Sequence, residues 1–211
     1  MQYLMIFLMV LTSCTETYFN AAGDYIKFIE NPKNGLKISK SYSEIEFIAK
    51  YLPVELKVLK ELEEKCDYQS YDSLHSIYLG SHYFIFSIAP GKNCPVDDLN
   101  YYEIHNQDEF AERKWYLNYS FNEQFILNIG GKEFFPKLFH HEQDYGMKGT
   151  LIFHLIFIPS ENTKEKTRKI NKMLLQFDDP IFNTGHSEFV FKGKFLRKIP
   201  PFKLKIMNNE Q

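Results

Sequence analysis

Residues 149–158 read GTLIFHLIFI, and this apolar run decides the fold class of the chain. It consists mainly of β-branched and aromatic residues, which favour extended strands. A second run at 82–88, HYFIFSI, lies between Gly80 and Pro90 and predicts a strand that is buried on both faces. Because 17% of all residues are aromatic, the composition also favours β structure.

The second half of the chain predicts an antiparallel β-sandwich. Trp115, Leu117, Tyr119 and Phe121 alternate with other residues, at the period of a half-buried strand. Gly130-Gly131 is a strong two-residue hairpin signal, and Pro136 favours an edge or bulge position in the strand that follows. The strands expected here span 115–121, 125–129, 132–141, 149–158, 173–177, 188–192 and 202–206. We expect the sandwich portion to cover about residues 115–206.

The first half predicts helices and additional strands. Residues 36–41 and 45–52 have the pattern of two strands around a turn. A helix is expected over 53–65, because Pro53 suits a first helical position and apolar residues follow at helical spacing. Residues 71–78 predict a second helix. We therefore expect one α+β domain over residues 35–211.

The N-terminus carries a different signal. Residues 3–11 are apolar throughout, which is the length of a signal-peptide core and too short for a membrane span. Leu11-Thr12-Ser13-Cys14 follows, and this stretch resembles the lipobox of bacterial lipoproteins. The resemblance implies that residues 1–13 are a signal peptide and that Cys14 becomes lipidated. Anchorage by two or three acyl chains would attach the protein stably to a membrane.

Other features near the N-terminus bear on this interpretation. No Lys or Arg precedes Cys14, and the first basic residue is Lys27, whereas signal peptides normally begin with basic residues. The alternative is a buried N-terminal segment with an ordinary core cysteine. The family resemblance implies sorting to the outer membrane, because Thr15 stands where aspartate commonly retains a lipoprotein at the inner membrane. Residues 14–34 are expected to form a lipid-anchored tether, in which 20 extended residues reach roughly 70 Å at most.

The remaining cysteines form an even pair once Cys14 is assigned to lipid. Cys66 and Cys94 would then form a disulfide in an oxidising periplasm, worth roughly 3.5 kcal/mol by the loop-entropy argument. The alternative is two free buried thiols. Neither cysteine belongs to a C-x-x-C pair, so the spacing does not indicate zinc.

The net charge of −2 argues against nucleic-acid binding, which usually requires a strong basic excess. Residues 164–172 carry five basic side chains, and a solvated loop is the default interpretation. Contact of this stretch with anionic head groups of lipids or glycans is the alternative.

The segment 178–189, DDPIFNTGHSEF, is the best polar concentration between two expected strands. We consider Asp178, Asp179, Asn183 and His186 a candidate binding loop, because carboxylates before a glycine-containing loop are able to bind Ca²⁺. The alternative is turn chemistry, in which aspartate caps the loop, proline fixes φ and Gly185 allows a positive φ.

Two further groups of residues, one rich in histidine and one aromatic, are candidate sites. His140, His141, Glu142 and nearby Asp144 form the one local cluster of metal-capable side chains, but adjacent strand residues point to opposite faces. His154 interrupts an apolar strand and is a candidate base, ligand or hydrogen-bonded histidine. The second group is an aromatic set that would suit sugars if its members are exposed together, and otherwise fits core packing: Tyr101, Tyr102, Trp115, Tyr116 and Tyr119.

The sequence thus predicts a membrane-anchored envelope lipoprotein of a Gram-negative bacterium, acting as a non-enzymatic binding or assembly module for another envelope protein. No common catalytic motif occurs, and neither a cofactor, a metal nor a catalytic residue is assigned. One alternative is an envelope hydrolase whose site is assembled from distant residues, such as His140, His154 and Asp178. The other alternative is a lipoprotein that captures glycans.

Overall fold

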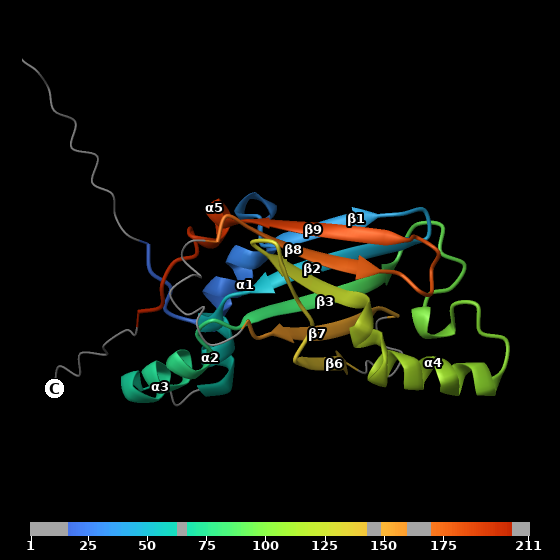
Figure 1. The fold of residues 1–211 in the computed structure, drawn as a ribbon, viewed down its shortest axis with the longest axis horizontal. Coiled ribbons are helices and arrows are strands. Elements are labelled where there is room, and N and C mark those ends of the chain that lie inside the picture. Colours follow the sequence, from blue (N-terminus) through green and yellow to red (C-terminus); the bar gives the residue numbers. More distant parts are fainter. Residues whose placement is uncertain (1–16, 63–66, 143–148, 160–169, 204–211) are drawn as a thin grey trace, which may run out of the picture.

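A computed structural model describes residues 17–62, 67–142, 149–159 and 170–203 (Figure 1). Within these residues the chain forms two antiparallel sheets and several helices, so the expected α+β class is confirmed. The five-stranded sheet has the order β1-β2-β3-β7-β6, with bounds Lys37–Ser41, Ile45–Leu52, His82–Pro90, Leu151–Phe157 and Leu138–Glu142. The four-stranded sheet has the order β5-β4-β8-β9, with bounds Lys132–Phe134, Phe125–Ile129, Lys172–Asp178 and His186–Lys192.

The two sheets pack face to face through phenylalanine side chains, which makes the fold a β-sandwich. Phe86 of β3 lies 4.7 Å from Phe177 of β8 between ring centroids, and 5.0 Å from Phe125 of β4. Phe84 and Phe191 make a similar contact at 5.2 Å. All five rings are essentially inaccessible to solvent, so the aromatic-rich composition serves this interior.

The N-terminal half of the chain contributes three of the five strands in the larger sheet. β3 pairs with β7 in antiparallel register, with Phe86 opposite Phe153. The sandwich is therefore not confined to residues 115–206 as the sequence analysis expected. The apolar runs at 82–88 and 149–158 become adjacent central strands, because the most apolar strands gain most from burial at the middle of a sheet.

The helices gather at the two ends of the sandwich (Figure 1). α1, α2 and α3 lie at one end, which we call the helical end, and α4 lies at the other end with the loop joining β8 to β9, which we call the loop end. The α-helices span Ala22–Glu30, Val54–Leu62, Tyr68–Tyr78, Gln107–Tyr119 and Gly193–Leu196, in order from α1 to α5. Short 3-10 helices span Pro32–Asn34, Leu99–Tyr101 and Phe121–Gln124.

The amphipathic helix α2 is confirmed close to its expected position. Val54 and Val58 pack with Tyr83 on the outer face of β3, so this end of β3 is buried on both faces. Further along β3, Ile85 and Ser87 are only half-buried on the same outer face. The expected burial of both faces therefore holds only where α2 covers the sheet.

Residues 17–34 are part of the domain, which corrects the expected tether over 14–34. Tyr25 and Ile29 of α1 belong to the main hydrophobic core, with exposed fractions of 0% and 2%. The Tyr25 hydroxyl donates a hydrogen bond to the backbone carbonyl of Pro200 at 2.9 Å. Phe19 forms an isolated parallel bridge with Phe202. Tyr25 and Ile29 are one helical turn apart, so both face the core although the rest of the segment is largely polar.

Two other expected strands differ in the structure. Residues 115–119 continue helix α4, whose N-cap Asn106 accepts a hydrogen bond from the backbone N–H of Glu109. The strand expected over 132–141 is divided at Pro136 into β5 and β6, which belong to different sheets. Of the strand expected over 202–206, Phe202 forms only the bridge to Phe19, and residues from 204 on lie outside the described part of the chain.

Candidate functional site

The four residues singled out in the sequence have two different roles in the loop between β8 and β9. Asp178 and His186 face each other as a cross-strand pair at the base of this loop. His186 Nδ1 lies 2.7 Å from Asp178 Oδ1, and His186 Nε2 lies 3.6 Å from Glu188 Oε1. The hydrogen bond to Asp178 raises the pKa of His186 above its ordinary value. All three side chains are largely exposed.

Asp179 instead builds the loop. Its Oδ1 accepts hydrogen bonds from the backbone N–H groups of Ile181 and Phe182, both at 2.9 Å. Its Oδ2 accepts from the backbone N–H and the hydroxyl of Thr184, at 2.9 and 2.7 Å. Gly185 has a φ of +72°, as the turn chemistry predicted. Four donors therefore occupy the Asp179 carboxylate, which directs it into the loop rather than toward a ligand.

Asn183 lies at the tip of the same loop, exposed and with a positive φ of +56°. Asparagine tolerates this left-handed conformation better than most residues do. Its role in the structure is that of a turn residue. The four candidates thus separate into an exposed Asp178–His186 pair and a structural Asp179 and Asn183.

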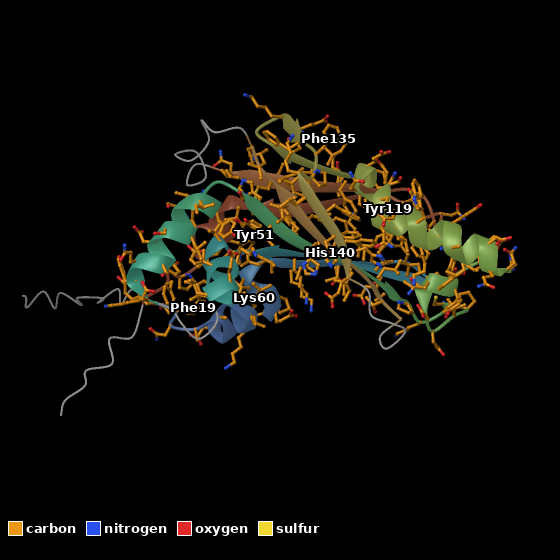
Figure 2. The ribbon with its side chains drawn as sticks, turned by 90° about the horizontal axis from the view of Figure 1, so that it is seen from below. Phe19, Tyr51, Lys60, Tyr119, Phe135 and His140 are labelled. Carbon is orange, nitrogen blue, oxygen red and sulfur yellow. The ribbon has the colours of Figure 1, made fainter. Side chains whose placement is uncertain are left out.

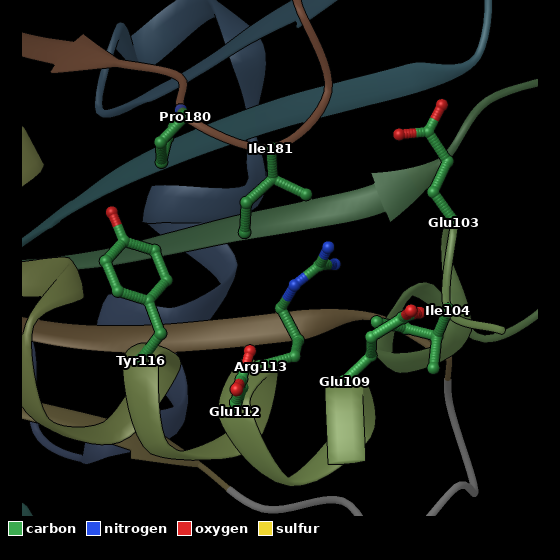
Figure 3. Close-up of a pocket in the computed structure, with 8 residues that line it drawn as sticks. All are labelled: Glu103, Ile104, Glu109, Glu112, Arg113, Tyr116, Pro180 and Ile181. Carbon is green, nitrogen blue, oxygen red and sulfur yellow. The ribbon is translucent and has the colours of Figure 1, made fainter. Parts of the chain in front are cut away.

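The loop also forms one wall of a groove of about 340 Å³ at the loop end (Figure 3). Pro180 and Ile181 line this wall, and helix α4 provides the opposite wall. The groove is lined by Glu103, Ile104, Glu109, Glu112, Arg113, Tyr116, Pro180 and Ile181. A volume of this size lies at the lower end of the range for small-molecule sites.

Arg113 projects from α4 into the groove (Figure 3). Its guanidinium donates one hydrogen bond to the Tyr102 carbonyl, at the long distance of 3.4 Å. It forms no ion pair with any residue in the described part of the chain. Desolvation lowers the pKa of Arg113, while the nearby charge of Glu103 acts in the opposite direction. The groove therefore contains a half-buried cation with unused donors.

The three glutamates that line the groove differ in whether their carboxylates already accept hydrogen bonds. Glu109 belongs to the N-terminal cap of α4, where its carboxylate accepts from His105 N–H and Asn106 Nδ2, each at 2.7 Å. Glu103 and Glu112 are exposed at the rim. Glu103 also has a positive φ of +53°, which is unusual for a residue with a side chain. Two carboxylates thus remain accessible beside Arg113.

The histidine cluster lies elsewhere, on strands β6 and β7 of the five-stranded sheet. His140 and His154 are cross-strand neighbours with ring centroids 5.9 Å apart, and Glu142 Oε2 lies 3.1 Å from His154 Nε2. His141 points the other way and stacks on Phe153 in the interior. His140 and His141 thus occupy opposite faces, as expected. Among the residues described, no group of three or more His, Cys, Asp or Glu side chains has the geometry to hold a metal ion.

The residues named for the hydrolase alternative are not brought together. His140 and His154 lie on the five-stranded sheet, whereas Asp178 lies at the end of β8 in the other sheet and pairs with His186. Asp144 and residues 164–169 of the basic stretch lie outside the described part of the chain.

The aromatic set is also divided. Trp115 and Tyr119 are exposed together on α4, with exposed fractions of 60% and 71% and ring centroids 5.8 Å apart. Tyr101 is also exposed, at 53%, but it stacks on Phe110 at 4.9 Å instead of on another member of the set. Tyr102 is buried, and Tyr116 is half-buried. The exposed aromatic pair therefore consists of Trp115 and Tyr119.

Cys94 is half-buried and is a free cysteine among the described residues. Because its expected partner lies outside these residues, the Cys66–Cys94 disulfide stays a prediction. Cys66 and the lipobox cysteine Cys14 both lie outside the described residues. Among the helices that the structure describes, none has the length and apolar character needed to span a bilayer.

Sequence reasoning missed Arg113, the one cation of the groove. It lies in the charged stretch 107–114, where a solvated surface is the ordinary interpretation. The Asn106 and Glu109 capping pattern was the available signal that a helix begins here. Only the approach of residues 180–181 to that helix creates the groove.

Comparisons with known proteins add little to this geometry. No protein-family profile matches the chain, and no curated protein matches it in sequence. One similar solved structure is described as a crystal structure of a novel protein of unknown function from Burkholderia pseudomallei K96243. The two share 11% sequence identity over 83% of this chain and 91% of that chain, with a TM-score of 0.35. A likeness this weak carries no argument about function.

Proposed function

We propose that the protein is a non-enzymatic binding module of the bacterial envelope, anchored by lipid on Cys14, that contacts another envelope protein through its loop end. The observation that carries this proposal is the placement of the exposed aromatic pair relative to the anchor. Phe19, two residues after the first described residue Thr17, lies at the helical end, whereas Tyr119 lies toward the opposite end (Figure 2).

The anchor would hold the domain close to the membrane. Cys14 precedes Thr17 by three residues, so covalent geometry limits the distance between them to about 10 Å. Phe19 is already joined to Phe202 of the domain. A lipid on Cys14 would therefore place the helical end at the membrane and direct α4 away from it.

The exposed pair Trp115 and Tyr119 suits a protein partner. Tryptophan and tyrosine are enriched among the residues that dominate binding energy at protein interfaces. Their ring planes are inclined by 44°, so together they do not form one flat platform. An angled pair fits the irregular surface of a protein better than the flat face of a sugar ring.

Glycan capture remains the second candidate function, because Trp115 and Tyr119 are indeed exposed together. A single exposed ring is sufficient to stack on one sugar. The two candidates differ in their requirement: a protein partner needs both rings, whereas a sugar needs only the ring on which it stacks.

The anchor is tested with Cys14→Ala in the intact bacterium. The unchanged protein should incorporate labelled fatty acid and require detergent for extraction. The variant should lose the label and become extractable without detergent. A variant that remains labelled would refute lipidation at Cys14.

The partner surface is tested by placing a photo-crosslinking amino acid at position 115 in living cells. We expect a discrete crosslinked protein product from position 115. A matched control places the same amino acid at Tyr68, which is 75% exposed on α3 at the helical end. Equal crosslinking from both positions, or none from position 115, would contradict a partner surface on α4. Crosslinking to glycan alone would favour the second candidate.

A further inference from the structure

We propose that the groove between α4 and the β8–β9 loop binds a small zwitterion of the amino-acid or dipeptide class, with the ligand carboxylate on Arg113 and its ammonium group at Glu103 and Glu112. This ligand site is separate from the exposed pair Trp115 and Tyr119, and it does not depend on the membrane anchor. Figure 3 shows Arg113 pointing toward the loop wall, with Glu112 beside it on α4 and Glu103 on the other side of its guanidinium.

The unused donors of Arg113 call for an anionic group. A guanidinium offers five N–H donors in a planar fork. One long hydrogen bond to the Tyr102 carbonyl leaves most of them without an acceptor in the described part of the chain. Partial burial of the guanidinium costs solvation free energy, and this cost lowers the pKa of Arg113 although the nearby charge of Glu103 opposes the shift. A carboxylate would restore the missing interaction, because it accepts two parallel hydrogen bonds from one guanidinium.

The glutamates exclude an isolated anion as the preferred ligand. Glu103, Glu109 and Glu112 line the same groove as the single cation Arg113. A ligand with negative charge alone would gain at Arg113 and be repelled by the carboxylates. Because Glu109 is held in the helix cap, Glu103 and Glu112 are the groups available to a ligand cation. A molecule with both charges satisfies both requirements.

The size and walls of the groove agree with a small ligand. Its volume of about 340 Å³ is at the lower end for small-molecule sites. Pro180, Ile181 and the ring of Tyr116 provide apolar surface on which a short side chain would pack. The Asp179 hydrogen bonds fix the backbone of residues 181 and 182, so this wall is preformed. A preformed wall reduces the ordering cost of binding.

The test uses isothermal titration calorimetry on the full chain in detergent micelles with three related probes. Alanyl-alanine carries both charges, N-acetylalanine carries only the carboxylate, and alanine amide carries only the ammonium group. We expect measurable binding of alanyl-alanine and at least about tenfold weaker binding of the two singly charged probes, as expected for the loss of one charged hydrogen-bonding pair. Free alanine, titrated in parallel, distinguishes an amino-acid site from a dipeptide site.

Variants assign the site to its residues. Arg113→Gln should weaken alanyl-alanine binding at least about tenfold, and Arg113→Lys should weaken it less, because lysine keeps the charge but loses the fork. Glu112→Gln should weaken it by a smaller factor. Lys114→Gln is the matched control: its ammonium lies over the Phe110 ring at 5.4 Å and does not line the groove. Binding affinities are compared only between variants whose melting temperature equals that of the unchanged protein.

Three outcomes would overturn the proposal. Equal affinity for N-acetylalanine and alanyl-alanine would show a simple anion site. Absence of binding by both zwitterions would reject the ligand class. Unchanged affinity in Arg113→Gln would place the ligand elsewhere. None of these outcomes affects crosslinking from position 115, so the zwitterion site and the proposed partner surface are tested independently of each other.

Discussion

The two ends of the sandwich place a histidine in opposite environments. At the helical end His82 is 2% exposed, its Nδ1 has no hydrogen-bond partner in the described part of the chain, and burial lowers its pKa to about 4. At the loop end His186 is exposed, and Asp178 raises its pKa. Burial therefore suppresses the charge of His82 at the helical end, whereas exposure beside Asp178 preserves the charge of His186 at the loop end.

This difference separates a region that supports the fold from one that is available for binding. The Tyr25 hydroxyl is buried against the Pro200 carbonyl, where it fixes the N-terminal segment to the C-terminal one. Arg113, in contrast, keeps its donors open to a groove. Changing pH and single side chains at each end tests the comparison directly.

The largest expected effect concerns His82. Because its folded-state pKa of about 4 is below the ordinary 6.5, only the unfolded chain gains a proton as the pH falls between these values. This proton uptake by His82 of the unfolded chain does not affect stability above pH 6.5. At pH 4 it lowers the free energy of unfolding by about 3 kcal/mol. Urea unfolding of His82→Phe should show a correspondingly smaller loss of stability between pH 7 and pH 4. The exposed His140→Gln should behave like the unchanged protein, and identical slopes in all three would contradict the burial of His82.

The second effect concerns the loop end. Asp179→Ala removes four hydrogen bonds that hold the β8–β9 loop. We expect a loss of about 2 kcal/mol in the free energy of unfolding, together with weaker ligand binding in the groove. Asp179→Asn should cost about half as much, because its Oδ1 still accepts from residues 181 and 182. If Asp179→Ala is as stable as the unchanged protein, other contacts hold the loop.

The third effect tests how firmly the N-terminal segment is attached. Tyr25→Phe removes the hydroxyl that donates to Pro200 and leaves a buried carbonyl without this donor. The expected cost is about 1 kcal/mol of unfolding free energy, measured by chemical denaturation. Tyr68→Phe, at a site that is 75% exposed, is the matched control and should be neutral. Equal stability of both variants would mean that this hydrogen bond contributes nothing.

The smallest effect concerns His186. Because its pKa is raised, the pair with Asp178 stabilises the fold below the ordinary histidine pKa, and this stability is lost as the pH rises through the raised pKa. Solvent screens an exposed pair, so the expected contribution is about 0.3 kcal/mol. NMR titration of the imidazole in the unchanged protein and in Asp178→Asn measures it. A pKa that does not fall in the variant would contradict the assigned cause.

Local patterns predicted the strands well where burial follows the sequence. The apolar runs at 82–88 and 149–158 formed strands because their residue types suit a sheet and each supplies an inward row of phenylalanines. The pattern failed at 115–121. In helix α4, Trp115 and Tyr119 are separated by one turn and lie on the same exposed side, while Leu117 is buried. Four apolar or aromatic residues at alternate positions therefore do not by themselves distinguish a strand from a helix.

The candidate site was only partly accessible to sequence reasoning. Asp178 and His186 were recognised because a hairpin brings the ends of neighbouring strands together. Arg113 and Ile181 are separated by a long stretch of chain and meet only through the packing of α4 against the β8–β9 loop. Local periodicity carries no information about such contacts, so the groove required the tertiary structure.

The bridge between Phe19 and Phe202 has a mechanical consequence. The strands run along the long axis of the molecule (Figure 1), and Phe19 of this bridge lies at the end opposite α4 (Figure 2). If the chain is held by lipid at one end and pulled by a partner at the other, the force is parallel to the strands. The hydrogen bonds between strands are then loaded together in shear rather than opened one after another. Such a domain would resist tension between a membrane and its partner.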